Sequence, residues 1–260
     1  MSNEPVLYEE KGHVAQIKLN RPENRNSMDE ETMKAFGQAL ERVRASRNLR
    51  CLVVTGSGST FCAGADFKSS LLDRKEGLPH EFLFQVYSPF LAVHDLPIPT
   101  IAAMNGHAIG GGFGLALVCD IRVANRAARY GANFARLGLH TGMGTSYLLP
   151  RLVGFSLASE LLFTGRLVDG ETALRMGLVN YAEEETRVLE RAWEIAREIA
   201  ICAPVAVRMI KRSIARGLAW DLRSAAEMEA HCQSRTFEME DAKEGVAALL
   251  EKRAPVFRGK

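Results

Sequence analysis

The stretch NGHAIGGGFG, residues 105–114, follows one short apolar run and precedes another that has helical character. Its three consecutive glycines, 110–112, let the chain turn tightly and let a ligand or a neighbouring strand approach the backbone closely. At the start of a helix, unpaired N–H groups and the helix dipole favour an anion or a developing oxyanion. Close packing of a helix on a strand explains the same glycines, so this stretch alone leaves both interpretations open.

Short, continuous apolar runs recur around this stretch, at Cys51–Val54, Thr100–Met104 and Ile121–Ala124. Such runs are typical of strands that are buried on both faces, as in parallel α/β packing. Near the N-terminus, residues 6–10 and 13–19 flank Lys11-Gly12 and predict a β-hairpin. The first half of the chain is therefore expected to form a sheet whose strands alternate with helices.

Helical spacing marks the remainder of the chain. Ser27 lies three residues before Glu30, which predicts a capping box at the start of an early helix. Further helices are predicted at 157–163, 171–176, 186–201, 204–216 and 221–240. This order predicts an α/β core at 1–195 and a helical C-terminal region at 196–260.

Composition excludes several classes of protein. The 260 residues are 47% hydrophobic and 25% charged, as in an ordinary soluble globular protein, and the net charge of +2 argues against nucleic-acid and membrane partners. No apolar signal segment or membrane-spanning stretch is present in the sequence. The five cysteines, at 51, 62, 119, 202 and 232, form no close pair, so we expect neither a metal site nor a redox pair. We expect reduced thiols in a cytoplasmic protein.

Two other segments are rich in small or turn-forming residues. The first, GSGSTFCAGAD at 56–66, follows a buried strand but lacks the Gly-Lys-Ser/Thr of a phosphate-binding P-loop. Taken alone, it is most simply interpreted as a turn. The second, NFARLGLHTGMG at 133–144, leads into an apolar helical segment.

In this order, the three segments resemble the crotonase (enoyl-CoA hydratase/isomerase) family, and the resemblance extends over nearly the whole chain. The matching segments are 20–22, 61–66, 105–120, 137–154, 162–165, 173–179 and 240–253. The resemblance implies a ClpP-like spiral of ββα turns, followed by a helical C-terminal region that forms trimers, usually as dimers of trimers.

The resemblance also implies the ligand. The substrate would be an acyl-CoA thioester, so coenzyme A enters as part of the substrate, with no permanently bound cofactor. The backbone N–H groups of Ala65 and Gly111 would form an oxyanion hole for the thioester oxygen. The backbone around Arg25, Ala63 and Asp66 would hold the adenine and pantetheine parts of coenzyme A.

The tail near Phe257 would help to cover the nucleotide, often from a neighbouring subunit. Hydratases of this family use two glutamates, but the corresponding positions here hold Gly114 and Phe134, neither of which can move a proton. His140 is the candidate acid or base, because histidine is the side chain that most often transfers protons in enzymes. A solvated loop histidine is the competing interpretation of His140.

Several reactions remain open at this stage. The leading hypothesis is a lyase or isomerase of the family that works through an enolate with nonstandard acid/base residues. Decarboxylation fits a site without a base, hydrolysis could use a water held by His140, and a non-catalytic acyl-CoA binder is the alternative class. Dehalogenation would need an aspartate near Gly142, and none is present. Basic residues at 208–216 are interpreted as a solvated helix face rather than an RNA site.

Overall fold

The computed structural model describes residues 4–66, 78–217 and 219–260. Its larger sheet has six strands in the order β1-β2-β3-β5-β7-β10. These strands are β1 (Val6–Lys11), β2 (Val14–Leu19), β3 (Cys51–Gly56), β5 (Thr100–Met104), β7 (Ile121–Asn125) and β10 (Tyr181–Glu183). Strands β1 and β2 pair antiparallel, which confirms the predicted hairpin, and every other pairing in this sheet is parallel.

A second, four-stranded sheet has the order β4-β6-β8-β9. Its strands are β4 (Thr60–Cys62), β6 (His107–Ile109), β8 (Arg129–Gly131) and β9 (Val168–Asp169). Three successive turns of chain, β3-β4, β5-β6 and β7-β8, each place one strand in each sheet before a helical segment follows. This repetition is the predicted ββα spiral, and it brings the ends of β4 and β6 together because these strands pair in parallel.

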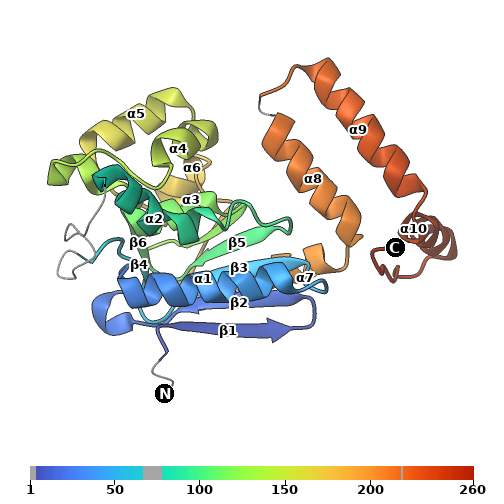
Figure 1. Ribbon diagram of the computed structural model, residues 1–260, viewed down its shortest axis with the longest axis horizontal. Helices are drawn as coiled ribbons and strands as arrows, with labels where there is room; N and C mark the ends of the chain where they lie inside the picture. Colours follow the sequence, from blue (N-terminus) through green and yellow to red (C-terminus); the bar gives the residue numbers. More distant parts are fainter. Residues whose placement is uncertain (1–3, 67–77, 218) are drawn as a thin grey trace.

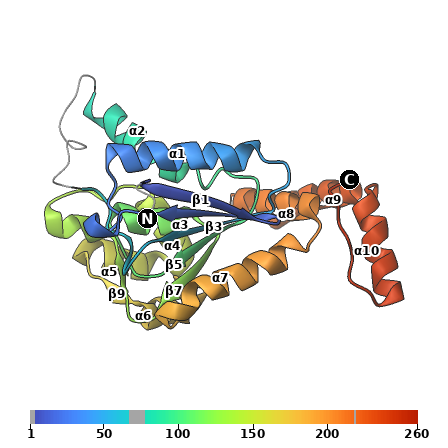
Figure 2. The same cartoon turned by 90° about the horizontal axis from the view of Figure 1, so that it is seen from below.

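Helices α1 (Glu30–Ala45) and α7 (Glu185–Ala200) cover opposite faces of the larger sheet (Figure 2). The early helix was predicted correctly, but its cap was not. The carboxylate of Asp29 accepts the N–H of Thr32 at 2.7 Å, whereas the Ser27 hydroxyl donates to the carbonyl of Asn24. Asp29 is therefore the N-cap, a role for which aspartate is well suited.

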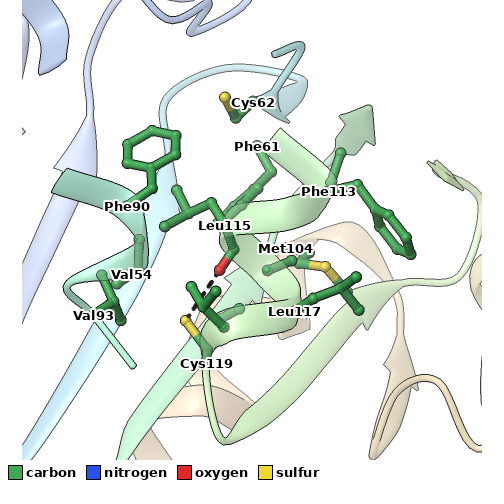
Figure 3. Packing of buried hydrophobic residues seen from close by; sticks show 14 of the residues in the cluster. Val54, Phe61, Cys62, Phe90, Val93, Met104, Phe113, Leu115, Leu117 and Cys119 are labelled. Carbon is green, nitrogen blue, oxygen red and sulfur yellow. Dashed lines mark hydrogen bonds between the residues drawn. The ribbon is translucent and has the colours of Figure 1, made fainter. Parts of the chain in front are cut away.

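The main core lies between α1, the larger sheet and α3 (Gly111–Val118), every residue of which is buried. Phe61 and Cys62 of the first glycine-rich segment, residues 56–66, belong to the same buried cluster as Phe113 and Leu115 of α3, and Figure 3 shows these four side chains. A smaller cluster joins the other sheet face to α7. The glycine-rich segments therefore rest on a rigid, fully buried base.

Four further helices surround the core in Figure 1. They are α2 (Pro79–Leu91), α4 (Thr145–Val153), α5 (Phe155–Thr164) and α6 (Gly170–Arg175). Short 3-10 helices lie at Pro22–Asn24 and Asn133–Leu137. None of the helices in the described ranges is long and apolar enough to cross a membrane.

The last three helices, α8 (Pro204–Gly217), α9 (Leu222–Phe237) and α10 (Glu240–Glu251), project from the body that contains the sheets (Figure 1). The helix predicted at 221–240 corresponds to α9, and the chain turns at 238–239 before α10. The predicted division after residue 195 falls inside α7, whose Ala196 and Ala200 remain packed on the sheet. The projecting region therefore begins with α8.

Candidate active site

The first glycine-rich segment is held by a buried amide. Asn26 is fully buried, and its Nδ2 donates to the carbonyls of Ser57 at 2.9 Å and Thr60 at 2.6 Å. Its Oδ1 accepts the N–H of Arg21 at 2.9 Å. One side chain thus ties the segment after β2 to the turn between β3 and β4, and both backbones are fixed relative to each other.

The end of this segment pairs with residues 25–28. Ala63 N–H donates to the carbonyl of Arg25 at 3.1 Å, Met28 N–H donates to Gly64, and Asp66 N–H donates to Met28. Met28 therefore bonds to the residues on either side of Ala65, in the manner of a parallel bridge. Successive N–H groups of an extended chain face opposite sides, so the N–H of Ala65 points away from Met28.

The second glycine-rich segment, residues 105–114, contacts the first at Gly64. A Cβ added to Gly64 would lie 2.9 Å from the Gly111 nitrogen and 2.8 Å from the Ile109 carbonyl. A Cβ added to Gly112 would collide with the carbonyl of Cys62. The two backbones touch directly, and only glycine permits this approach.

This contact places two backbone amides next to each other. The Ala65 nitrogen is two covalent bonds from the Gly64 Cα, which adjoins the Gly111 nitrogen. Gly111 opens α3, and the first intrahelical bond of its turn comes from the N–H of Gly114 to Gly110. Across the described ranges, neither the Ala65 nor the Gly111 N–H has a protein acceptor, as expected for a loop and a first helical turn.

A methionine occupies the space beside Gly114. A Cβ added to Gly114 would collide with the Cβ of Met143, which is almost fully buried. Met143 has the left-handed backbone angle φ of 58°, uncommon for a residue with a side chain. The strained backbone turns the methionine onto α3, so no side chain fits at the first predicted glutamate position.

Phe134 places an aromatic ring beside Gly110, the residue that precedes α3. Its Cζ lies 3.7 Å and the Oδ1 of Asn133 lies 3.6 Å from where a Cβ at Gly110 would be. Phe134 is half-buried and packs against the main core. The second predicted glutamate position therefore presents hydrocarbon to the start of α3.

Helix α2 contributes a hydroxyl that the sequence did not single out. A Cβ added to Gly142 would lie 2.6 Å from the Tyr87 hydroxyl oxygen. Burial raises the pKa of Tyr87 above its ordinary value, so the phenol keeps its proton. Next to it, the Thr141 hydroxyl oxygen is buried and has no protein hydrogen-bond partner within the described ranges.

The remaining predicted residues are distributed differently. Arg25 is exposed in the left-handed region with φ of 60°, and its carbonyl contacts the first segment. His140 is exposed, and its Nδ1 lies 2.7 Å from the Thr141 carbonyl oxygen. The structure thus brings Arg25 and Ala63 to the glycine-rich segments and leaves His140 at the surface of the third segment.

Phe257 lies elsewhere in the chain. Its carbonyl accepts a hydrogen bond of 2.7 Å from Arg50, which immediately precedes β3, while the glycine-rich segment follows the opposite end of that strand. Its ring lies against Gly245 of α10. Within one chain, Phe257 is not brought to the amides of Ala65 and Gly111.

Other chemistries find little support among the described residues. No group of histidine, cysteine, aspartate and glutamate there is arranged to hold a metal ion. Burial raises the pKa of the Cys62 thiol to about 12, so this cysteine remains protonated at neutral pH. The chemistry of the site therefore rests on backbone amides and hydroxyls rather than on a thiolate.

Comparison with known proteins identifies relatives of this chain. A sequence model of enoyl-CoA hydratase/isomerase matches residues 9–260. The chain is 40% identical to enoyl-CoA hydratase domain-containing protein 2 of Bos taurus, over 95% of this chain and 84% of the relative. It is 35% identical to the short-chain-enoyl-CoA hydratase of Clostridium acetobutylicum, over 95% of both chains.

The fold is also similar to those of solved structures. An enoyl-CoA hydratase from Bacillus anthracis superposes with a TM-score of 0.91 at 34% identity, covering 98% of this chain and all of that chain. The match extends through both sheets and the C-terminal helices. The chain belongs to the enoyl-CoA hydratase/isomerase family.

Proposed function

We propose that this protein binds an acyl-CoA thioester and stabilises its enolate oxygen with the N–H groups of Ala65 and Gly111. The observation that supports the proposal is the direct contact of Gly64, the residue before Ala65, with the backbone nitrogen of Gly111. An enolate oxygen carries more negative charge than the thioester carbonyl from which it forms. Two fixed N–H donors therefore stabilise the transition state more than the ground state.

The reaction that fits this site best is loss of carbon dioxide from a malonyl-type thioester. The bond between the α-carbon and the carboxylate breaks, and its electron pair forms the enolate, so no base is needed. The absence of a carboxylate at Gly114 and Phe134, with Met143 filling the space beside Gly114, favours this reaction over two-glutamate hydration. Apolar surroundings also favour decarboxylation, because they destabilise the charged carboxylate of the substrate relative to the neutral carbon dioxide that it becomes.

Coenzyme A would be held mainly by the backbone of the first segment. Arg25, Ala63 and Asp66 adjoin the proposed oxyanion hole, and we assign their backbone to binding the adenine and pantetheine parts of coenzyme A. Phe257 is assigned to the nucleotide of a neighbouring subunit, because it is distant from the amides of its own chain. Binding energy at the nucleotide would position the acyl group without taking part in the reaction.

Hydrolysis through a water held by His140 is less well supported, because that side chain is exposed and bonded to the adjacent backbone. A non-catalytic acyl-CoA binder is the remaining alternative. It predicts binding of thioesters without turnover of malonyl-type, β-keto-acyl- or crotonyl-CoA.

The test is Gly111→Pro, which removes one proposed donor at the first residue of α3, where a new Cβ would displace the flexible end of Met28, 2.6 Å away. Loss of one such donor costs about 2.7–4 kcal/mol, so kcat for decarboxylation should fall about 100- to 1,000-fold. The control is Glu240→Pro, which makes the same change at the first residue of α10. Thermal unfolding shows whether each variant is folded, and unchanged kcat in folded Gly111→Pro protein would refute the oxyanion role.

We also propose that the chain forms a homotrimer or a dimer of trimers. Neither α8 nor α9 contains a buried residue in the ranges described, and large apolar side chains on them are exposed, including Ile210, Ile214 and Phe237. A second copy would cover this surface. Light scattering of the purified protein should give three or six times the mass of one chain, and a monomer at micromolar concentration would contradict the proposal.

A further inference from the structure

We propose that Tyr87 is the proton donor to the enolate carbon, an inference that rests on the proposed function. Decarboxylation produces an enolate that must take up one proton at the α-carbon before product can leave. The family-typical carboxylates are replaced by Gly114 and Phe134, so another group must supply this proton. Tyr87 is placed to do so by a continuous series of contacts.

The contacts run from the hydroxyl to the proposed oxyanion hole. The Tyr87 oxygen lies over Gly142, 2.6 Å from where its Cβ would be, and the ring Cζ lies at 3.0 Å. The next residue, Met143, packs directly on Gly114. Gly114 is one turn of α3 after Gly111, so these contacts connect the phenol, through Met143, to the helix that carries the proposed amide.

The hydroxyl is available to a ligand. In the described ranges, Tyr87 makes no protein hydrogen bond, although its ring packs against the main core. By contrast, the buried Tyr130 hydroxyl donates to the Asn125 carbonyl at 2.9 Å, and the Tyr8 hydroxyl donates to Glu10. Tyrosine hydroxyls in apolar surroundings normally find a partner, so the one at Tyr87 is suited to a bound molecule.

The neighbouring groups are less suited to this role. The Thr141 hydroxyl is buried and is a much weaker acid than a phenol, and His140 is exposed with its Nδ1 against the Thr141 carbonyl. Burial raises the pKa of Tyr87, which keeps the phenol protonated throughout the neutral range. Tyr87 thus enters each cycle with its proton in place.

The step balances without a further reactant. After carbon dioxide has left, the enolate double bond supplies the electron pair that forms the new bond between the α-carbon and the phenol hydrogen. The thioester carbonyl re-forms as the charge leaves its oxygen, and Tyr87 becomes a phenolate. One proton from solvent then restores the phenol, so the net reaction consumes one proton for each carbon dioxide released.

The experiment uses Tyr87→Phe, which removes the hydroxyl and keeps the ring. Wild type and variant are given a malonyl-CoA that carries an alkyl group at the α-carbon, in heavy water, and the configuration of deuterium in the product is measured. The control is Tyr147→Phe on α4, whose parent ring is 55% exposed and stacks under Arg151. Thermal unfolding confirms that all three proteins are folded.

Wild type and Tyr147→Phe should deliver deuterium to one face and give a single configuration. Tyr87→Phe should give both configurations and lower kcat about 100-fold, since a positioned general acid contributes about 10²–10⁴-fold. A single configuration retained by Tyr87→Phe would overturn the assignment of Tyr87. No carbon dioxide release by wild type from any malonyl-type thioester would instead reject the proposed function, and the Tyr87 assignment with it.

Discussion

At the scale of single residues, this site is defined by side chains that exclude a carboxylate as much as by those that are present. Met143 fills the space beside Gly114, and it reaches that space through a left-handed backbone that a side chain rarely adopts. Phe134 covers the adjoining edge. A hydratase would therefore not be restored by placing one glutamate at either position.

Gly114→Ala tests this packing. Because the new methyl group would collide with the Met143 Cβ, the variant should lose about 1–3 kcal/mol of unfolding free energy. Gly37→Ala on α1 is the matched control, since its Cβ would come no closer than 4.0 Å to Pro89. The control should gain up to about 1 kcal/mol in chemical denaturation, and equal stability of both variants would show that Met143 does not occupy this space.

Asn26→Asp tests the buried amide that holds the first glycine-rich segment. A carboxylate would leave the carbonyls of Ser57 and Thr60 without their donor and would itself be buried. We expect a loss of about 2–4 kcal/mol in urea unfolding, because each unsatisfied buried group costs about 1–3 kcal/mol. Asn48→Asp, at an exposed position, should change little. A stable Asn26→Asp protein would mean that the segment is held by other contacts.

At the scale of elements, periodicity predicted the parts of the chain with one clear environment. The buried runs at Cys51–Val54 and Thr100–Met104 are strands, and the amphipathic C-terminal segments are helices. Sequence spacing also located the two glycine-rich segments, because glycine is required wherever two backbones touch. Family resemblance then supplied the order in which these segments meet.

The contacts missed by the sequence are those between distant segments. Tyr87 on α2 contacts Gly142 in the loop before α4, and the left-handed backbone of Met143 leaves no periodic signal in the sequence. The spacing of Ser27 to Glu30 fits a capping box, but in the structure the backbone turn makes Asp29 the N-cap of α1. Such choices depend on tertiary packing, which local patterns do not record.

Lys211 tests how the projecting helices are attached. From α8 its Nζ donates to the Asp120 carboxylate at 2.7 Å and to the Ile98 carbonyl at 2.9 Å. Asp120 also accepts two hydrogen bonds from Thr100, so it braces the start of β5 as well. Lys211→Met should speed hydrogen exchange of α8, consistent with about 1.5–3 kcal/mol for bonds to a charged group.

The exposed Arg212 gives a control on the same helix. Arg212→Met should leave the exchange rates of α8 near those of wild type. Equal exchange in both variants would show that α8 is held to the core by other contacts, such as that of Arg208 with the Leu49 carbonyl.

At the scale of the whole molecule, the C-terminal tail is folded back onto α10. Glu244 accepts hydrogen bonds from Arg253 at 2.6 and 2.9 Å and from the Val256 N–H at 2.8 Å. Asp241 accepts the N–H groups of Arg258 and Gly259. The tail that carries Phe257 is therefore positioned before any neighbouring subunit binds.

This tether should depend on pH. The hydrogen bonds from Arg253 and then from Val256 lower the pKa of Glu244 from 4.5 to about 2. A lowered folded-state pKa stabilises the tail above pH 4.5, and that contribution is lost as pH falls from 4.5 through 2. The protection of residues 252–260 against hydrogen exchange, taken relative to the intrinsic exchange rate at each pH, should fall over this range, while Glu244→Gln should already lack this protection at pH 6. A tail in Glu244→Gln as protected as in wild type would contradict the tether.

The central claim concerns one oxygen atom and two backbone amides. The most direct measurement is a crystal structure with an unreactive acyl-CoA analogue, in which a ketone replaces the thioester. We predict that the ketone oxygen lies about 2.7–3.1 Å from the nitrogens of both Ala65 and Gly111. A ketone oxygen bound elsewhere, with either amide turned away or covered by a side chain, would contradict the account.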